Sequence, residues 1–141
     1  MSEDSERSVQ MSRLEKGRFD VVNPRGGRMV IGHGGVDEAF TPVELLLAAI
    51  AGCTATDVDF ITTKRAEPVR FDVSITGDKI RDDLGNRMSD LVLSFDVAFG
   101  DDDAGRAATE RVADAVRASH DRLCTVSRTV EVGTPVETRI A

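Results

Sequence analysis

One apolar helix constrains this chain more than any other feature of its sequence. Thr41, Pro42 and Glu44 form a helix start: Thr41 caps, Pro42 takes the first helical position, and Glu44 completes a capping box. The segment that follows, from Val43 to Cys53, is apolar on every side apart from Glu44. A helix without a polar face has to be buried all round. One small domain can hardly surround it, so we expect a second copy of the chain to cover it in a homodimer.

The rest of the chain shows the two periodicities of strands and helices. We expect the central helix to end before Pro68, and an apolar stripe predicts a second helix over 104–123, headed by three aspartates. Alternation of apolar and polar residues predicts a hairpin of two strands over 13–31. The same pattern predicts three further strands over 69–76, 88–99 and 129–140. The order β-β-α-β-β-α-β predicts an α+β fold dominated by antiparallel strands around a buried central helix.

Length and charge narrow the class of protein. At 141 residues the chain fits a single domain over 1–141, of which residues 1–12, rich in serine and glutamate, are expected to be disordered. The formal net charge of −7 argues against nucleic acid and against anionic membranes as partners. The N-terminus has no secretory signal pattern, and the longest apolar stretch is about half of a membrane span. We therefore expect a cytoplasmic protein, in which a disulfide would be transient.

The two cysteines leave two interpretations open. Cys53 ends the apolar helix, and Cys124 follows the second helix between Arg122 and Arg128. Each is explained by packing, because free cysteines are commonly buried. Each is also explained by redox chemistry, in which one thiolate is oxidised to a sulfenic acid and the other thiol resolves it to a disulfide. No C-x-x-C motif decides between them.

Other candidate residues carry weaker signals. His120 and Cys124 are four residues apart, and His33 and Cys53 would complete a Cys2His2 set, but the spacing of a zinc site is missing at both ends. We expect no metal and no cofactor. Arg28 is explained as a solvated turn residue, or as a guanidinium that reaches a thiol and is oriented by Glu44. Phosphate-loop and Ser-His-Asp patterns are absent.

Three motifs together resemble the OsmC/Ohr family, which comprises osmotically inducible and organic hydroperoxide resistance proteins. They are Thr41–Thr54 (TPVELLLAAIAGCT), Leu123–Ser127 (LCTVS) and Gly133–Val136 (GTPV). The resemblance covers residues from about 15 to the end. It implies an intertwined α+β homodimer whose sites lie at the interface, and a thiol peroxidase that takes organic hydroperoxides, with hydrogen peroxide as a second substrate. An external dithiol would act as reductant.

The same resemblance assigns roles to four residues. Cys53 matches the peroxidatic cysteine, Cys124 the resolving cysteine, and Arg28 in Gly26-Gly27-Arg28 the activating arginine. In the hydroperoxide-resistance branch the catalytic glutamate directly follows the proline, whereas here Glu44 comes one residue later. That shift rotates a side chain by about 100° around a helix. The alternative is a dimeric OsmC-like protein without catalysis that binds a small apolar ligand, with both cysteines as packing.

Overall fold

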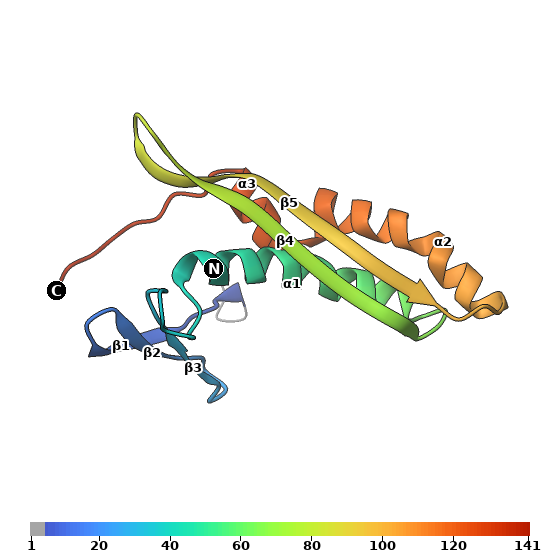
Figure 1. Ribbon diagram of the computed structural model, residues 1–141, viewed down its shortest axis with the longest axis horizontal. Helices are drawn as coiled ribbons and strands as arrows, with labels where there is room; N and C mark the ends of the chain where they lie inside the picture. Colours follow the sequence, from blue (N-terminus) through green and yellow to red (C-terminus); the bar gives the residue numbers. More distant parts are fainter. Residues whose placement is uncertain (1–4) are drawn as a thin grey trace. The chain divides into compact units, whose positions relative to one another are not determined.

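The chain divides into two units, Met1–Leu46 and Leu47–Ala141, and each is described by itself. The computed structural model describes residues 5–141 (Figure 1). The fold is α+β with antiparallel strands and helices, as the sequence predicts. The extent of the domain stays a prediction.

The first unit is a three-stranded antiparallel sheet. Its strands are β1 (Gln10–Glu15), β2 (Arg18–Val22) and β3 (Arg28–Ile31), in the order β1-β2-β3. The sequence predicts only two strands over 13–31, so the prediction lacks one strand of this sheet. Residues 10–12 were expected to be disordered, but Gln10 pairs with Val22 and joins the sheet. The same expectation covers residues 1–4, which lie outside the described part of the chain.

Helix α1 (Pro42–Thr62) begins as its sequence predicts. The Thr41 N–H donates to Glu44 Oε1 at 2.9 Å, and the Glu44 N–H donates to Thr41 Oγ1 at 3.2 Å, which is the predicted capping box. The helix ends at Thr62, before Pro68. By length and composition α1 could cross a membrane, so the apolar segment is longer than the sequence pattern suggested. The core helix of a protein that crosses no membrane meets the same description.

Only one stripe of α1 is buried by its own chain. Ile50, Thr54, Val58 and Thr62, spaced by four, form that stripe. Phe60 on another side is 67% exposed. Burial on every side, which the sequence predicts, is thus not reached within one copy of the chain.

A long hairpin forms the sheet of the second unit. Strand β4 (Pro68–Asp82) pairs antiparallel with β5 (Gly85–Phe99), and both extend beyond the predicted strands toward their common turn. Asp82 fixes the turn, because its Oδ1 accepts the Leu84 N–H at 2.9 Å and its Oδ2 accepts from Arg87 at 2.7 Å. Across the pair, the rings of Phe71 and Phe95 meet edge to face at 6.2 Å.

Helix α2 (Asp103–Ala118) follows the hairpin. Asp102 caps it by accepting the Gly105 N–H at 2.7 Å. Ala108, Ala115 and Ser119 of the predicted stripe are buried. Leu123 is 48% exposed instead, because the helix widens into a π-helical turn, η2 (Ser119–Leu123), which changes the direction of the last side chains.

The predicted final strand over 129–140 is wrong. Thr125–Glu131 form helix α3, and residues 132–141 have no regular secondary structure. Two local interactions favour the helix over a strand. Cys124 caps its N-terminus, and the Thr129 hydroxyl donates to the Thr125 carbonyl at 2.7 Å.

The second unit thus has two layers, with the β4–β5 hairpin lying along helices α1 and α2 (Figure 1). Side chains of both layers line one cavity between them, described below. This layering places the end of α2 and the start of α3 beside the middle of α1.

A substitution at Gly105 tests how closely the backbone packs at the junction between the hairpin and α2. A Cβ at Gly105 would overlap the carbonyl oxygen of Gly100. We predict that Gly105→Ala lowers the free energy of unfolding by about 1–3 kcal/mol, because the backbone has to move. Glu110→Ala, at an exposed position of the same helix, should change it by less than about 0.5 kcal/mol. Chemical denaturation measures both, and equal effects would contradict this account of the junction.

Candidate functional site

The two cysteines lie together in the second unit. Cys53 comes from the middle of α1 and is partly exposed, whereas Cys124 lies between η2 and α3 and is 1% exposed. Both are free thiols, and they lie close enough for each to shift the pKa of the other. The sequence separates these residues widely, and the fold brings them into contact.

Cys124 is held by backbone and side-chain hydrogen bonds. Its own N–H donates to the Ser119 carbonyl at 2.8 Å, which fixes it to η2. Its sulfur accepts the Ser127 N–H at 3.3 Å, and the Ser127 hydroxyl lies 3.3 Å from the same sulfur. The Thr54 side chain lies near enough to the sulfur to help lower its pKa. The Cys-x-x-Ser spacing therefore works as a helix cap in which sulfur replaces the usual oxygen.

The surroundings of the two thiols shift their pKa values in opposite directions. Burial alone would raise the pKa of Cys124, but the hydrogen bonds from Ser127, Cys53 and Thr54 outweigh it and lower that pKa. Burial raises the pKa of Cys53, and the hydrogen bond to Cys124 raises it further. The Val126 N–H opposes this shift, and the charge of Asp57 adds to it.

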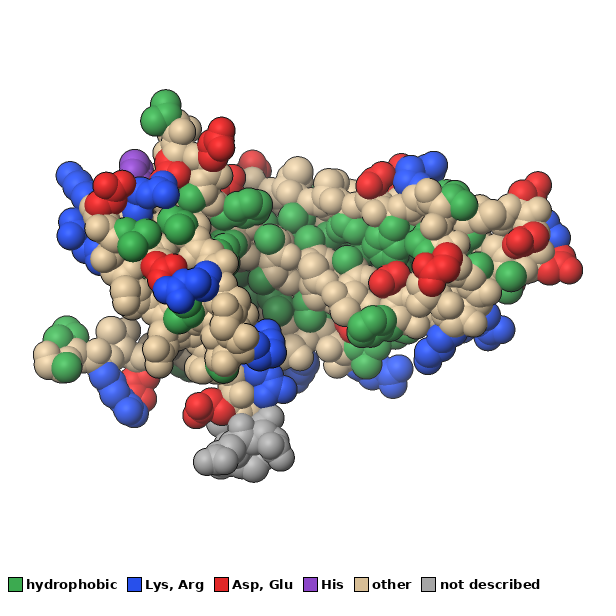
Figure 2. Space-filling view, turned by 90° about the horizontal axis from the view of Figure 1, so that it is seen from below, with side chains coloured by type: hydrophobic (Ala, Val, Ile, Leu, Met, Phe, Trp, Pro, Cys, Tyr) green, Lys and Arg blue, Asp and Glu red, His purple; other side chains and the backbone are tan. Residues whose placement is uncertain are grey.

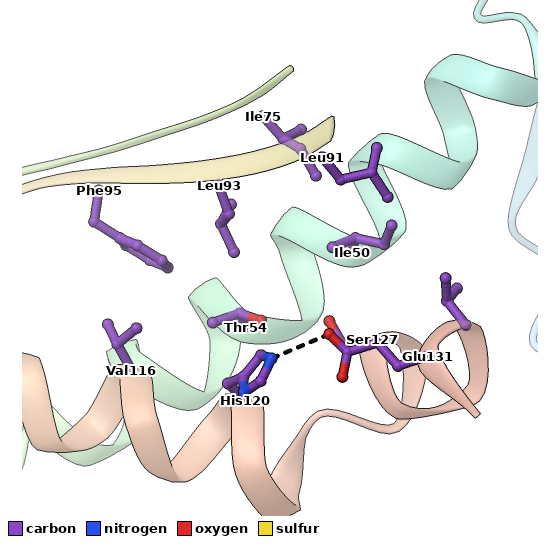
Figure 3. Close-up of a pocket in the computed structure, with 11 residues that line it drawn as sticks. Ile50, Thr54, Ile75, Leu91, Leu93, Phe95, Val116, His120, Ser127 and Glu131 are labelled. Atoms are coloured by element: carbon purple, nitrogen blue, oxygen red, sulfur yellow. Dashed lines mark hydrogen bonds and ion pairs between the residues drawn. The ribbon is translucent and has the colours of Figure 1, made fainter. Parts of the chain in front are cut away.

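An apolar cavity of about 330 Å³ lies between the two layers of this unit (Figure 3). Neither cysteine lines it, but Ser127, which hydrogen-bonds to Cys124, does. Its polar end holds Thr54, His120, Ser127 and Glu131. The apolar lining comes from both layers of the unit and consists of Ile50, Ile75, Leu91, Leu93, Phe95, Val116 and Val130. The cavity can take a small molecule with an apolar body and a polar end.

Two polar pairs hold η2 to its neighbours. The Ser119 hydroxyl, which is fully buried, donates to Asp57 Oδ2 on α1 at 2.7 Å. His120 Nε2 lies 3.1 Å from Glu131 Oε1 on α3, and its Nδ1 lies 3.1 Å from Asp121 Oδ1. Together they fix the turn that leads into Cys124.

Arg28 and Glu44 belong to the first unit. The Arg28 side chain is 68% exposed and donates to Asp20 Oδ2 at 2.7 Å. Glu44 takes part in the capping box of α1. Within the described residues no ion pair joins Arg28 to Glu44, so their roles near a thiol stay predictions.

The structure does not support the Cys2His2 zinc site considered from the sequence. His120 uses both ring nitrogens on carboxylates, and His33 lies in the first unit. Among residues 5–141, no three histidine, cysteine or acidic side chains are grouped as a metal site.

Sequence reasoning missed several residues of the site. Thr54 directly follows Cys53, and Asp57 lies one helical turn beyond it, so both could have been found by helical spacing. The pairing of His120 with Glu131 had no such signal, because it depends on α3, where a strand was predicted.

These features define a class, which is an α+β protein with two neighbouring free thiols, one buried and one partly exposed, and an apolar cavity in the same unit. The family model for OsmC-like protein matches residues 32–139. The chain belongs to the OsmC-like family.

Relatives match this chain over most of their length. An uncharacterised protein of Mycobacterium tuberculosis is 27% identical over 124 residues, which cover 87% of this chain and 88% of that protein. The OsmC-like protein of Mycoplasma pneumoniae superposes with a TM-score of 0.72 at 11% identity, over 91% of this chain and 89% of the other. The organic hydroperoxide resistance protein OhrB of Bacillus subtilis superposes with a TM-score of 0.54 at 16% identity, over 88% of this chain and 90% of the other. The two solved structures show the shared fold.

The His120–Glu131 pair should make stability depend on pH. Asp121 and then Glu131 raise the pKa of His120, so protonated His120 stabilises the folded state. This contribution is complete below about pH 6, the range of an unperturbed histidine, and is lost as pH rises through the raised value. We predict that His120→Gln lowers the free energy of unfolding by less than about 1 kcal/mol, because the pair is exposed. The loss should be present near pH 5–6, where both carboxylates are ionised and His120 is protonated, and should vanish at alkaline pH. An equal loss at about pH 5.5 and at alkaline pH would contradict the pairing.

Proposed function

We propose that this protein is a thiol-dependent peroxidase that reduces organic hydroperoxides, and hydrogen peroxide as a second substrate. One observation carries the proposal: in a chain of the OsmC-like family, two free cysteines lie close enough to shift each other's pKa, and Ser127, which hydrogen-bonds to Cys124, also lines an apolar cavity. Solved structures that share the fold include organic hydroperoxide resistance proteins.

The proposed reaction has three steps. The Cys53 sulfur attacks the outer peroxide oxygen, so that an S–O bond forms, the O–O bond breaks, and the alcohol leaves with the thiol proton. Cys124 then attacks the Cys53 sulfenic acid, which forms the disulfide and releases water. An external dithiol reduces that disulfide by thiol–disulfide exchange.

Cys53 is the better candidate for the attacking sulfur. It is partly exposed, whereas Cys124 is 1% exposed and so is poorly reached by a peroxide. The neighbouring cavity would take the apolar part of an organic hydroperoxide, and Thr54 and Ser127 at its polar end lie beside the sulfurs.

We also propose a homodimer in which Arg28 holds the peroxide and Glu44 orients Arg28. Large hydrophobic side chains that one copy leaves exposed support the dimer, among them Phe60 at 67% and Val69 at 72%. Figure 2 shows hydrophobic side chains exposed on one face of the molecule. A cytoplasmic location, where dithiol reductants are present, fits this proposal.

Peroxide consumption tests the proposal. With a dithiol reductant in excess, the wild type should consume an organic hydroperoxide catalytically, and Cys53→Ser should lose this activity by at least about 100-fold, because serine is not a comparable nucleophile. Cys124→Ser should still react once per chain, since the first step needs only Cys53. Folding of each variant is checked by circular dichroism, and equal rates for wild type and Cys53→Ser would contradict the proposal.

The cavity also supports a second candidate, the binding of a small apolar ligand without catalysis. Its apolar lining and volume of about 330 Å³ suit such a ligand. In that case both thiols should stay unreactive toward hydroperoxide at neutral pH. A ligand that binds with similar affinity to wild type and to the Cys53→Ser, Cys124→Ser double variant would favour it.

A further inference from the structure

A surface recess of about 260 Å³ borders Cys124 and shares no lining residue with the apolar cavity. Its lining comes from η2, from α3 and from the segment that follows α3. Cys53 does not line it. Besides Cys124, the polar residues of the lining are two arginines and three threonines, which are Arg122, Arg128, Thr125, Thr129 and Thr134. The recess is therefore a polar approach to Cys124.

The two arginines of the recess have no acidic partner. Within the described residues, the side chains of Arg122 and Arg128 form no ion pair or hydrogen bond, although most arginines of the same unit form ion pairs. The acidic residues close to them in sequence, Asp121 and Glu131, are held by His120 instead, each at 3.1 Å. Two exposed cations thus share one recess in a chain of net charge −7. Such a pair attracts an anionic ligand.

The polar groups around these cations suit a carboxylate. A guanidinium binds a carboxylate through two parallel N–H donors, and a threonine hydroxyl can add a single hydrogen bond. The hydroxyls of Thr125 and Thr134 are free in the described part of the chain, whereas that of Thr129 donates to the Thr125 carbonyl. With about 260 Å³, the recess is slightly smaller than common ligand pockets, so it fits a small carboxylate.

We propose that this recess binds a carboxylate of the reductant, so that the external dithiol of this protein is an anionic one. The inference rests on the peroxidase function proposed above and deepens it, because it names the class of reductant and the place where it binds. Cys124 is 1% exposed, so a thiol in free solution rarely meets its sulfur. Binding next to Cys124 raises the effective concentration of the attacking thiol there.

The reduction then proceeds by two balanced exchanges. A thiolate of the bound reductant attacks the Cys124 sulfur, so that a mixed disulfide forms and the bond between Cys53 and Cys124 breaks. The Cys53 sulfur leaves with the electron pair and takes a proton from solvent. The second thiol of the reductant, as its thiolate, attacks the reductant's own sulfur in the mixed disulfide. Cys124 is released as a thiolate and is protonated, and the reductant leaves oxidised by two electrons, as an internal disulfide.

Two thiols that differ in charge test the proposal. They are 3-mercaptopropionate, which carries a carboxylate, and 3-mercapto-1-propanol, which carries a hydroxyl in its place. The disulfide form of the protein is prepared with diamide, so the measurement needs no peroxidase activity, and the appearance of protein thiols follows its reduction. Replacing both arginines (Arg122→Gln, Arg128→Gln) should slow reduction by 3-mercaptopropionate about tenfold, because two exposed ion pairs are lost. Reduction by the alcohol should change by less than about twofold.

A matched variant removes the same charge at another place. Arg65→Gln combined with Arg81→Gln removes two exposed arginines that are unpaired in the described residues and lie outside the recess. It should leave both rates unchanged within about twofold. The effect of the recess variant should shrink as the salt concentration rises, because salt screens exposed charges. Circular dichroism checks that both variants fold.

Cys53→Ser gives a test that needs no protein disulfide, since Cys124 is then the only cysteine of the chain. Exchange of Cys124 with the symmetrical disulfide of each test thiol forms a mixed disulfide, which mass spectrometry measures. The ratio of the two rates, carboxylate to alcohol, should fall about tenfold when Arg122→Gln and Arg128→Gln are added.

Two results would overturn the proposal. One is that the two test thiols respond alike to the loss of both arginines, or that neither of their disulfides reacts at Cys124 in Cys53→Ser. The other is that the Arg65, Arg81 variant slows 3-mercaptopropionate as much as the recess variant does. Failure of the peroxidase function is distinguishable from both. A charge preference at Cys124 without peroxide consumption supports the recess and refutes the function, whereas peroxide consumption without that preference refutes the recess alone.

Discussion

The hydrogen bonds to the Cys124 sulfur are the interaction on which the second unit depends. The Cys124 sulfur caps α3 by accepting the Ser127 N–H, and the backbone N–H of Cys124 ties this residue to η2. Thr54 and Cys53 of α1 lie close enough to lower the pKa of Cys124. Three helical segments therefore meet at one buried atom. A thiolate is a stronger acceptor than a thiol, so the charge state of Cys124 and the packing of these segments are coupled.

The same contacts connect the fold to the proposed chemistry. The site needs one sulfur that reaches substrate and a second one close enough to form a disulfide, and α1 and the start of α3 provide them. The layer of β4 and β5 adds the apolar wall of the cavity, where an alkyl group would be held away from water (Figure 3). Membership of the OsmC-like family and the geometry of the pair support the same function by separate routes.

Local sequence signals predicted the local structure well. The capping box of α1 and the buried stripe of α2 each depend on residues close in sequence, and both are present. The strand predicted over 129–140 failed because alternation was read without the cap at Cys124, which starts a helix there. The motifs pointed to the cysteine pair, but the order of its two pKa values could not be predicted, because the donors come from three separate segments. The arginine beside the thiol stays a prediction, since Arg28 belongs to the first unit.

The central claim is that Cys53 and Cys124 form a working redox pair, and mass spectrometry after one equivalent of an organic hydroperoxide tests it most directly. The reduced protein should lose two hydrogens, and peptide mapping should find a disulfide between Cys53 and Cys124 within one chain. In Cys124→Ser the sulfenic acid of Cys53 should accumulate and be trapped by a dimedone-type reagent. Two unmodified thiols, or oxidation of Cys53 to the sulfinic acid while Cys124 stays reduced in the wild type, would contradict the claim.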